Sequence, residues 1–168
     1  MLFSANARLE DRRRIAWATC ATCLKPATLM VRTACGSFGY FDDAGNRDFL
    51  AALAEALKPG AKLMLDTHVL ESLLPQTIRR EWTELDGDLL VLEEREYDHT
   101  TGIMTRRWQV RHGAQIERST LSILIYSYRE LVERLEDAGF TDCKGYTWMS
   151  IVPFMTGANR LVMVATRA

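Results

Sequence analysis

The sequence predicts an α/β fold whose helix-and-strand framework is interrupted by an antiparallel β insert. A helical pattern followed at once by a short apolar strand lies at 43–65, three strand-like segments follow one another between 89 and 126, and a capped helix with two more strands fills 127–166. An apolar strand directly after a helix is typical of a parallel sheet covered on both faces. Strands joined by short turns are typical of antiparallel pairs.

Local signals bound the first helix–strand unit. Asp42-Asp43-Ala44-Gly45-Asn46 offers turn and N-cap residues, and apolar residues then recur at helical spacing. Lys58-Pro59-Gly60 ends the helix, and Ala61–Leu65 forms a strand that runs into Asp66-Thr67-His68. Val69–Leu74 then begins another short helix.

The middle of the chain predicts the insert, over about 80–126. We expect its strands at Leu89–Tyr97, Ile103–His112 and Gln115–Tyr126, with a hairpin turn between the first two. Because side chains alternate along a strand, Trp108 and Arg107 fall on opposite faces, and the alternation does not indicate which face meets a ligand.

The last part of the chain returns to the framework. Ser127 and Glu130 form a capping box, in which each side chain satisfies a free backbone N–H, and Gly139 ends the helix that follows. Thr141–Met149 and Arg160–Thr166 are predicted as an antiparallel pair of closing strands.

Composition bounds the function. The chain has 168 residues, 48% of them hydrophobic, and a net charge of −1, as expected of one globular domain with no general attraction to nucleic acid or anionic membrane. No apolar run is long enough to span a bilayer and no signal peptide is evident, so a cytoplasmic location is expected. Residues 1–35 carry six basic and two acidic residues. We interpret these charges as a surface that faces solvent, and the alternative is a basic arm that binds nucleic acid.

Three of the four cysteines lie in the first 35 residues. Cys20 and Cys23 have the spacing of a zinc knuckle or a redox pair. A structural zinc site needs about four ligands, and the remaining candidates, among them Cys35 and Cys143, form no recognisable second half. We therefore expect no metal site.

Four passages together resemble the small-molecule class I S-adenosylmethionine-dependent methyltransferases. They are Gly36–Asp43, the run from Leu57 through Lys58-Pro59-Gly60 to His68, the helix from Tyr126 to Phe140, and the final strand Leu161–Ala165. Their order and spacing cover 36–168. The resemblance implies a partial Rossmann-like methyltransferase sheet, equivalent to strands 4–7 of that family, with S-adenosylmethionine as cofactor and a small molecule as methyl acceptor.

The resemblance also implies site residues, because ligands bind outside the carboxyl ends of parallel strands. Gly36, Ser37 and Phe38 would line the methionine end of the cofactor. His68 is either a general base for an amine or hydroxyl or a structural histidine. The remaining candidates are substrate contacts: Tyr40, Phe41, Asp66, Trp108 and Tyr126.

The N-terminal segment 1–35 departs from the family pattern. It contains no glycine, whereas the family has a glycine-rich turn after its first strand. A one-base shift of frame in codons for Ala18–Ala27 can read Gly-Asp-Met-Arg-Asp-Leu-Pro, a passage typical of the family, so we interpret 18–35 as a frameshifted translation. A front half missing before Met1 would leave a sheet edge exposed to self-association and impair catalysis. The alternative is a non-catalytic binding or assembly module derived from a methyltransferase.

Overall fold

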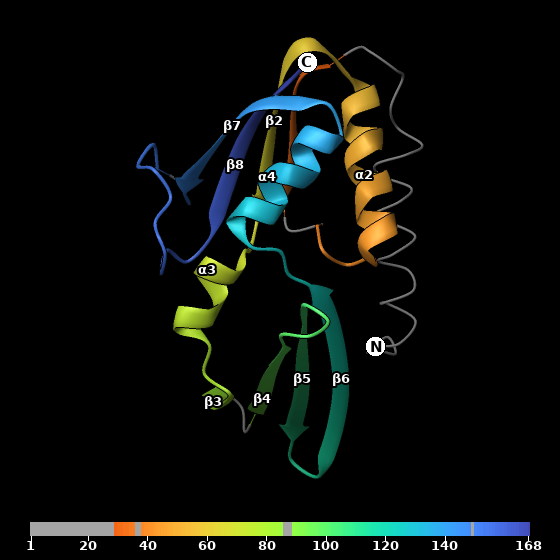
Figure 1. Cartoon of the computed structure of the whole chain (residues 1–168). Coiled ribbons are helices and arrows are strands. Elements are labelled where there is room, and N and C mark those ends of the chain that lie inside the picture. The colour runs from red at the N-terminus through yellow and green to blue at the C-terminus, as the bar shows by residue number, and fades with distance from the viewer. Residues whose placement is uncertain (1–28, 36–37, 86–88, 149) are drawn as a thin grey trace.

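A computed structural model describes residues 29–35, 38–85, 89–148 and 150–168 (Figure 1). The cysteine pair Cys20 and Cys23, the predicted cofactor residues Gly36 and Ser37, and most of the segment interpreted as frameshifted lie outside the described residues. The last seven residues of that segment form the first strand.

The first sheet is the α/β framework that the sequence predicts. Its strands lie in the order β1-β2-β8-β7. Their bounds are β1 Leu29–Cys35, β2 Leu57–Thr67, β7 Phe140–Thr147 and β8 Leu161–Arg167. β1 pairs parallel to β2, whereas β8 runs antiparallel to both β2 and β7, which confirms the expected closing pair. Strand β2 begins at Leu57, four residues before the predicted start, because Leu57 already pairs with Leu29 of β1.

Two helices cover one face of this sheet, α2 (Asp43–Ala56) and α4 (Tyr128–Asp137) (Figure 1). The N-cap of α2 lies within the stretch predicted to supply it, and the N-cap of α4 is the predicted Ser127. Asp42 accepts the backbone N–H of Gly45, and Ser127 forms the capping box with Glu130. Apolar side chains of both helices join those of β2 and β8 in one core, whose fully buried members include Leu50, Leu53, Leu63, Leu65, Leu131, Leu135, Leu161 and Met163.

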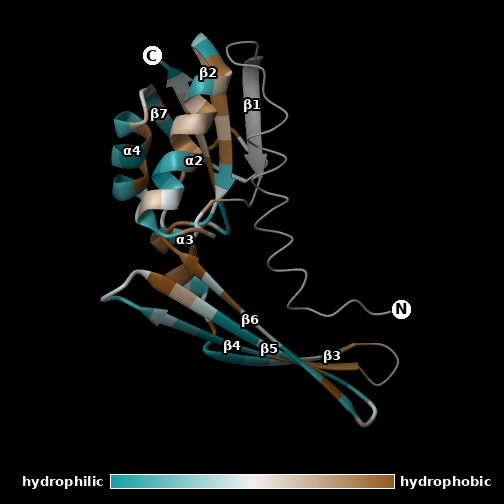
Figure 2. Ribbon diagram, turned by 90° about the vertical axis from the view of Figure 1, so that its right-hand side faces the viewer, coloured by the Kyte–Doolittle hydropathy of each residue, from teal (hydrophilic) through white to brown (hydrophobic). Residues whose placement is uncertain are grey.

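Alternation along the strands assigns the other face. Because Leu63 and Leu65 point into the core under the helices, Met64 and Asp66 point to the opposite side of the sheet. Met64 is 38% exposed, whereas Asp66 is buried by a partner described below. In Figure 2, α2 and α4 lie together on one side of the sheet.

The second sheet is the insert, with strands in the order β3-β4-β5-β6, all antiparallel (Figure 2). Their bounds are β3 Arg80–Leu85, β4 Leu89–Asp98, β5 Ile103–His112 and β6 Gln115–Leu124. The short helix α3 (Leu70–Leu73) and the 3-10 turn η1 (Leu74–Gln76) lead from the first sheet into it. The predicted third strand ends at Leu124 rather than Tyr126, because the chain turns there into the core.

Within the described residues, β1 has β2 as its sole strand partner, so it forms one end of the framework sheet. No helix of the described part of the chain is long and apolar enough to cross a membrane.

Candidate functional site

The candidate site lies where the framework sheet meets the insert. The parallel register pairs Cys35, the last residue of β1, with Asp66 near the end of β2, so both strands finish at one edge. The turn into α2 therefore starts beside Asp66-Thr67-His68. This edge brings together the predicted residues Phe38, Tyr40, Phe41, Asp66 and His68.

Asn46 of α2 holds the turn after β1. Its side chain is 1% exposed; its Oδ1 accepts the N–H of Gly39 at 3.2 Å, and its Nδ2 donates to the carbonyl of Phe41 at 2.9 Å. Gly39 has φ +94°, and a Cβ there would lie 2.5 Å from the carbonyl oxygen of Leu124. The turn is thus clamped between α2 and the end of β6, in a conformation that favours glycine.

The predicted aromatic residues divide between core and surface. Phe38 is 6% exposed and packs against Tyr126, with ring centroids 5.3 Å apart, so its ring belongs to the core and only its backbone is left for a ligand. Tyr40 and Phe41 are half-buried, and Phe41 packs against Phe49 of α2.

The contacts of Tyr126 join it to residues of α2 and α4. Its hydroxyl donates to Asp43 at 2.9 Å and accepts from Asn46 at 3.3 Å, and the guanidinium of Arg134 lies over its ring. Burial raises the pKa of Tyr126 to about 12; the hydrogen bond from Asn46 opposes this rise, and the hydrogen bond to Asp43 adds to it. Tyr126 therefore ties the end of the insert to both helices, and its predicted contact with substrate stays a prediction.

His68 follows β2 and is half-buried. Its Nδ1 is buried and has no hydrogen-bond partner among the described residues. Burial lowers the pKa of His68 below its ordinary value, and the charges of Arg160 and Arg106 lower it further against the opposing effect of Asp66. The imidazole is therefore neutral at neutral pH, which is the charge state that a general base requires, and its buried Nδ1 carries no hydrogen bond to a described residue.

Asp66 is 3% exposed and is held by Arg160, the residue before β8. Arg160 donates from Nε to Oδ1 and from Nη2 to Oδ2, each at 2.8 Å, and its guanidinium lies 5.1 Å from the centre of the Trp148 ring. Both carboxylate oxygens of Asp66 are thus engaged. The sequence indicated neither Arg160 nor Trp148, because both become neighbours of Asp66 only through the pairing of distant strands.

The insert places Trp108 and Arg107 on opposite faces, as alternation predicts. Trp108 lies on the face of Arg106, whose guanidinium is 4.8 Å from the Trp108 ring and whose charge acts on His68. Arg107 lies on the other face, where it bonds Glu96. Trp108, and not Arg107, therefore shares a face of the insert with Arg106, whose charge acts on His68. The sequence did not indicate Arg106 as part of the site.

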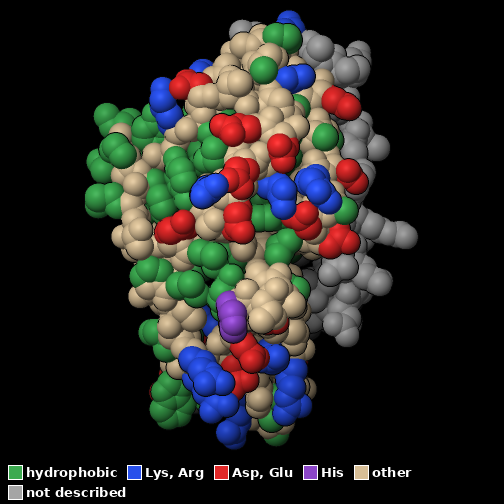
Figure 3. Space-filling view, viewed as in Figure 1, with side chains coloured by type: hydrophobic (Ala, Val, Ile, Leu, Met, Phe, Trp, Pro, Cys, Tyr) green, Lys and Arg blue, Asp and Glu red, His purple; other side chains and the backbone are tan. Residues whose placement is uncertain are grey.

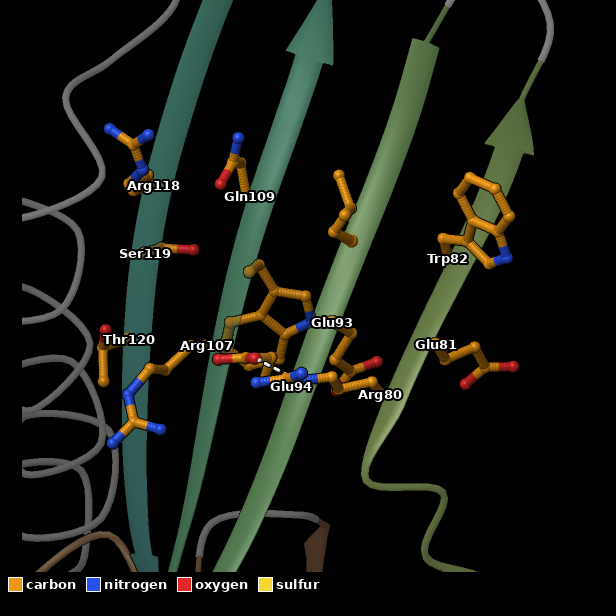
Figure 4. Close-up of a pocket in the computed structure, with 12 residues that line it drawn as sticks. Arg80, Glu81, Trp82, Glu93, Glu94, Arg107, Gln109, Arg118, Ser119 and Thr120 are labelled. Carbon is orange, nitrogen blue, oxygen red and sulfur yellow. Dashed lines mark hydrogen bonds and ion pairs between the residues drawn. The ribbon is translucent and has the colours of Figure 1, made fainter.

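A hollow of about 660 Å³ lies over the face of Arg107 (Figure 4). Two rows of paired residues provide its side chains, and these rows are Arg80–Glu94–Arg107–Thr120 and Trp82–Leu92–Gln109–Arg118. Arg80 bonds Glu94 across the hollow at 2.7 Å. The row between these two, Glu81–Glu93–Trp108–Ser119, also lines the hollow.

Apolar side chains gather on the loop between β7 and β8, at the left in Figure 3. Ile151 is 91% exposed and Met155 64% exposed, next to the half-exposed Trp148 and Val152. Because β7 ends at the same edge as β2, this loop borders the candidate site. Within the described residues, no group of three or more His, Cys, Asp or Glu side chains could hold a metal ion.

No protein-family model matches the sequence, and no curated protein matches it. Several solved structures are nevertheless similar to the chain in fold. The CcbJ methyltransferase from Streptomyces caelestis superposes with a TM-score of 0.72 at 16% identity, over 86% of this chain and 59% of that one. An S-adenosylmethionine-dependent methyltransferase from Clostridium acetobutylicum gives 0.69 at 13% identity, over 98% and 72%.

A third similar structure is CalS10, an amino pentose methyltransferase from Micromonospora echinaspora with S-adenosylmethionine bound. It has a TM-score of 0.57 at 19% identity, over 84% of this chain and 59% of that one. The chain thus has the fold of part of an S-adenosylmethionine-dependent methyltransferase, and spans about three-fifths of the length of CcbJ and CalS10. This confirms the predicted fold class, a partial Rossmann-like sheet with an antiparallel insert.

Proposed function

We propose that this chain carries the acceptor side of a site for S-adenosylmethionine-dependent methyl transfer to a small molecule, with His68 as the general base. The observation that carries the proposal is the neutral, half-buried imidazole of His68, with its unpartnered Nδ1, at the edge where β1 and β2 end. The fold supports the reaction class, and the name of CalS10, an amino pentose methyltransferase, supports a small-molecule acceptor.

By the family resemblance, Gly36, Ser37 and Phe38 would hold the methionine part of the cofactor. Phe38 is the one of the three within the described residues, and Asn46 fixes the turn that follows it. S-adenosylmethionine supplies an electrophilic methyl group on a sulfonium. The adenosine end fits less well, since residues 1–35 contain no glycine and therefore lack the glycine-rich turn that the family resemblance implies. We therefore propose that transfer is impaired in this chain.

His68 would accept the proton that an acceptor amine or hydroxyl loses as its lone pair forms the new bond to carbon. A neutral imidazole can do so at neutral pH, and such proton transfer contributes roughly 10²–10⁴-fold. Tyr40, Phe41 and Trp108 would flank the acceptor and exclude water. Alignment of the reacting atoms supplies most of the remaining acceleration in such transfers.

The alternative is a non-catalytic binding or assembly module, favoured by the absence of any glycine in residues 1–35. A related proposal is self-association through the edge of β1, which pairs only with β2 among the described strands. Light scattering tests it: we expect a concentration-dependent rise in mass, and a constant monomer mass would exclude it.

Calorimetry with S-adenosylmethionine and S-adenosylhomocysteine tests the proposed function. We expect both to bind the wild type and His68→Gln, while only the wild type transfers labelled methyl groups to a panel of small amines and phenols. His99→Gln is the matched control, because His99 is exposed in the β4–β5 turn. Absence of any heat of binding would favour the module, and transfer retained in His68→Gln would remove His68 from the mechanism.

A further inference from the structure

Arg160 lies across the sheet from His68. The antiparallel register pairs Thr67 with Leu161, so one further step along the ladder sets Arg160 opposite His68, with Asp66 one pleat back on the same face. Side chains at opposite and diagonal positions of an antiparallel pair reach one another. Asp66, His68 and Arg160 therefore form one cluster at the site edge.

Arg160 is held rigidly in this cluster. Two parallel hydrogen bonds join its guanidinium to Asp66, and the Trp148 ring lies beneath it. Bidentate arginine–carboxylate pairs fix orientation as well as charge, and a planar guanidinium stacks on an aromatic ring in a way that lysine does not reproduce. Its Nη1 has no hydrogen-bond partner within the described residues.

The charged groups that bear on His68 come from three elements. Arg160 precedes β8, Asp66 is in β2, and Arg106 is in β5 of the insert. Arg106 is already bonded to Glu93, whose side chain is 13% exposed. Arg160 directly precedes Leu161, the last paired residue of β8 at this edge, and it is the largest electrostatic influence on His68 after burial.

We propose that Arg160 is a positioning residue of this site, held by Asp66 and Trp148 so that its fixed charge adds to the effect of burial in favouring the neutral His68 imidazole. The role of His68 as a proton acceptor rests on the proposed function. The effect of Arg160 on the protonation of His68 does not rest on it, and that effect can be measured without any substrate.

A purely structural role of the ion pair makes a different prediction. If the pair only closes the strand edge, removing either partner admits water to His68 and raises its pKa in both cases. If the charge of Arg160 acts directly, the two partners act in opposite directions. Loss of the cation favours imidazolium, whereas loss of the Asp66 anion disfavours it.

The experiment is an NMR titration of the His68 ring in the full chain, comparing Arg160→Gln, Asp66→Asn and Arg160→Lys with the wild type. We expect the midpoint to shift upward in Arg160→Gln, shift downward in Asp66→Asn, and stay near the wild-type value in Arg160→Lys, which keeps the charge. Arg129→Gln is the matched control, because Arg129 is 88% exposed on α4 and its one ion pair with a described residue is to Glu133.

An upward shift in both Arg160→Gln and Asp66→Asn, or no shift in either, would overturn the proposal. Should Arg160→Gln fail to fold, the direction in Asp66→Asn decides alone, because the two accounts give it opposite signs. Failure of the proposed function would leave no binding of S-adenosylmethionine but would not alter these titrations, so the two failures are distinguishable.

Discussion

Replacing Asn46 by alanine tests the clamp on the turn that ends β1. Among the described residues, the Asn46 side chain makes three hydrogen bonds, with Gly39, Phe41 and the Tyr126 hydroxyl, of which the first and last are buried and the second is part-buried. At about 1 kcal/mol for each bond lost, Asn46→Ala should lower the free energy of unfolding by about 3 kcal/mol. For a chain of this size, that corresponds to a fall in Tm of roughly 6–12 °C.

Urea unfolding followed by circular dichroism measures this loss. Arg47→Ala is the control on the same helix, because Arg47 is 54% exposed and has one ion pair, to Asp43. An exposed pair of this kind contributes about 0.3–0.5 kcal/mol. Hydrogen exchange should also show the Gly39 amide losing protection in Asn46→Ala. A stability within about 1 kcal/mol of Arg47→Ala would refute the three-bond account.

Three further predictions concern other parts of the chain. Gly39→Ala should destabilise the fold by more than about 1 kcal/mol in urea unfolding, because a Cβ would meet the Leu124 carbonyl at 2.5 Å, with φ at +94°; Gly113→Ala, also at positive φ but in open space, should cost less. The Asp98 carboxyl should titrate near 2, since bonds from Thr100 and Thr101 lower its pKa to about 2 from 3.8. Its stabilising contribution is then present above pH 3.8 and lost as the pH falls through 2, so the stability difference between wild type and Asp98→Asn should vanish there. Sequencing of the genomic locus should show a one-base shift within the codons of 18–35; unambiguous bases through an intact frame would exclude the frameshift.

Local signals were sufficient for most of the fold. The caps Asp42 and Ser127 depend on residues three positions away, and the hairpins depend on short turns, so the sequence alone predicts α2, α4 and strands β4 to β6. Strand β3 was harder to predict, because all six of its residues are exposed and no burial alternates along it.

The candidate site was only partly predictable, since its contacts join distant segments. The edge itself follows from the order of strands, which brings Phe38 and His68 together. Arg160 lies 94 residues from its partner Asp66, and Asn46 lies 80 residues from its partner Tyr126. No local sequence pattern indicates either pair. The face of the insert that includes Trp108 likewise depends on how the two sheets meet.

The most direct test of the central claim is an NMR titration of the labelled chain with S-adenosylmethionine. The account predicts saturable shifts of the His68 ring and of the backbone amides of Phe38 and Gly39, while the His99 ring, in the exposed β4–β5 turn, stays unchanged. Absence of shifts at saturating ligand, or shifts confined to residues away from this strand edge, would contradict it.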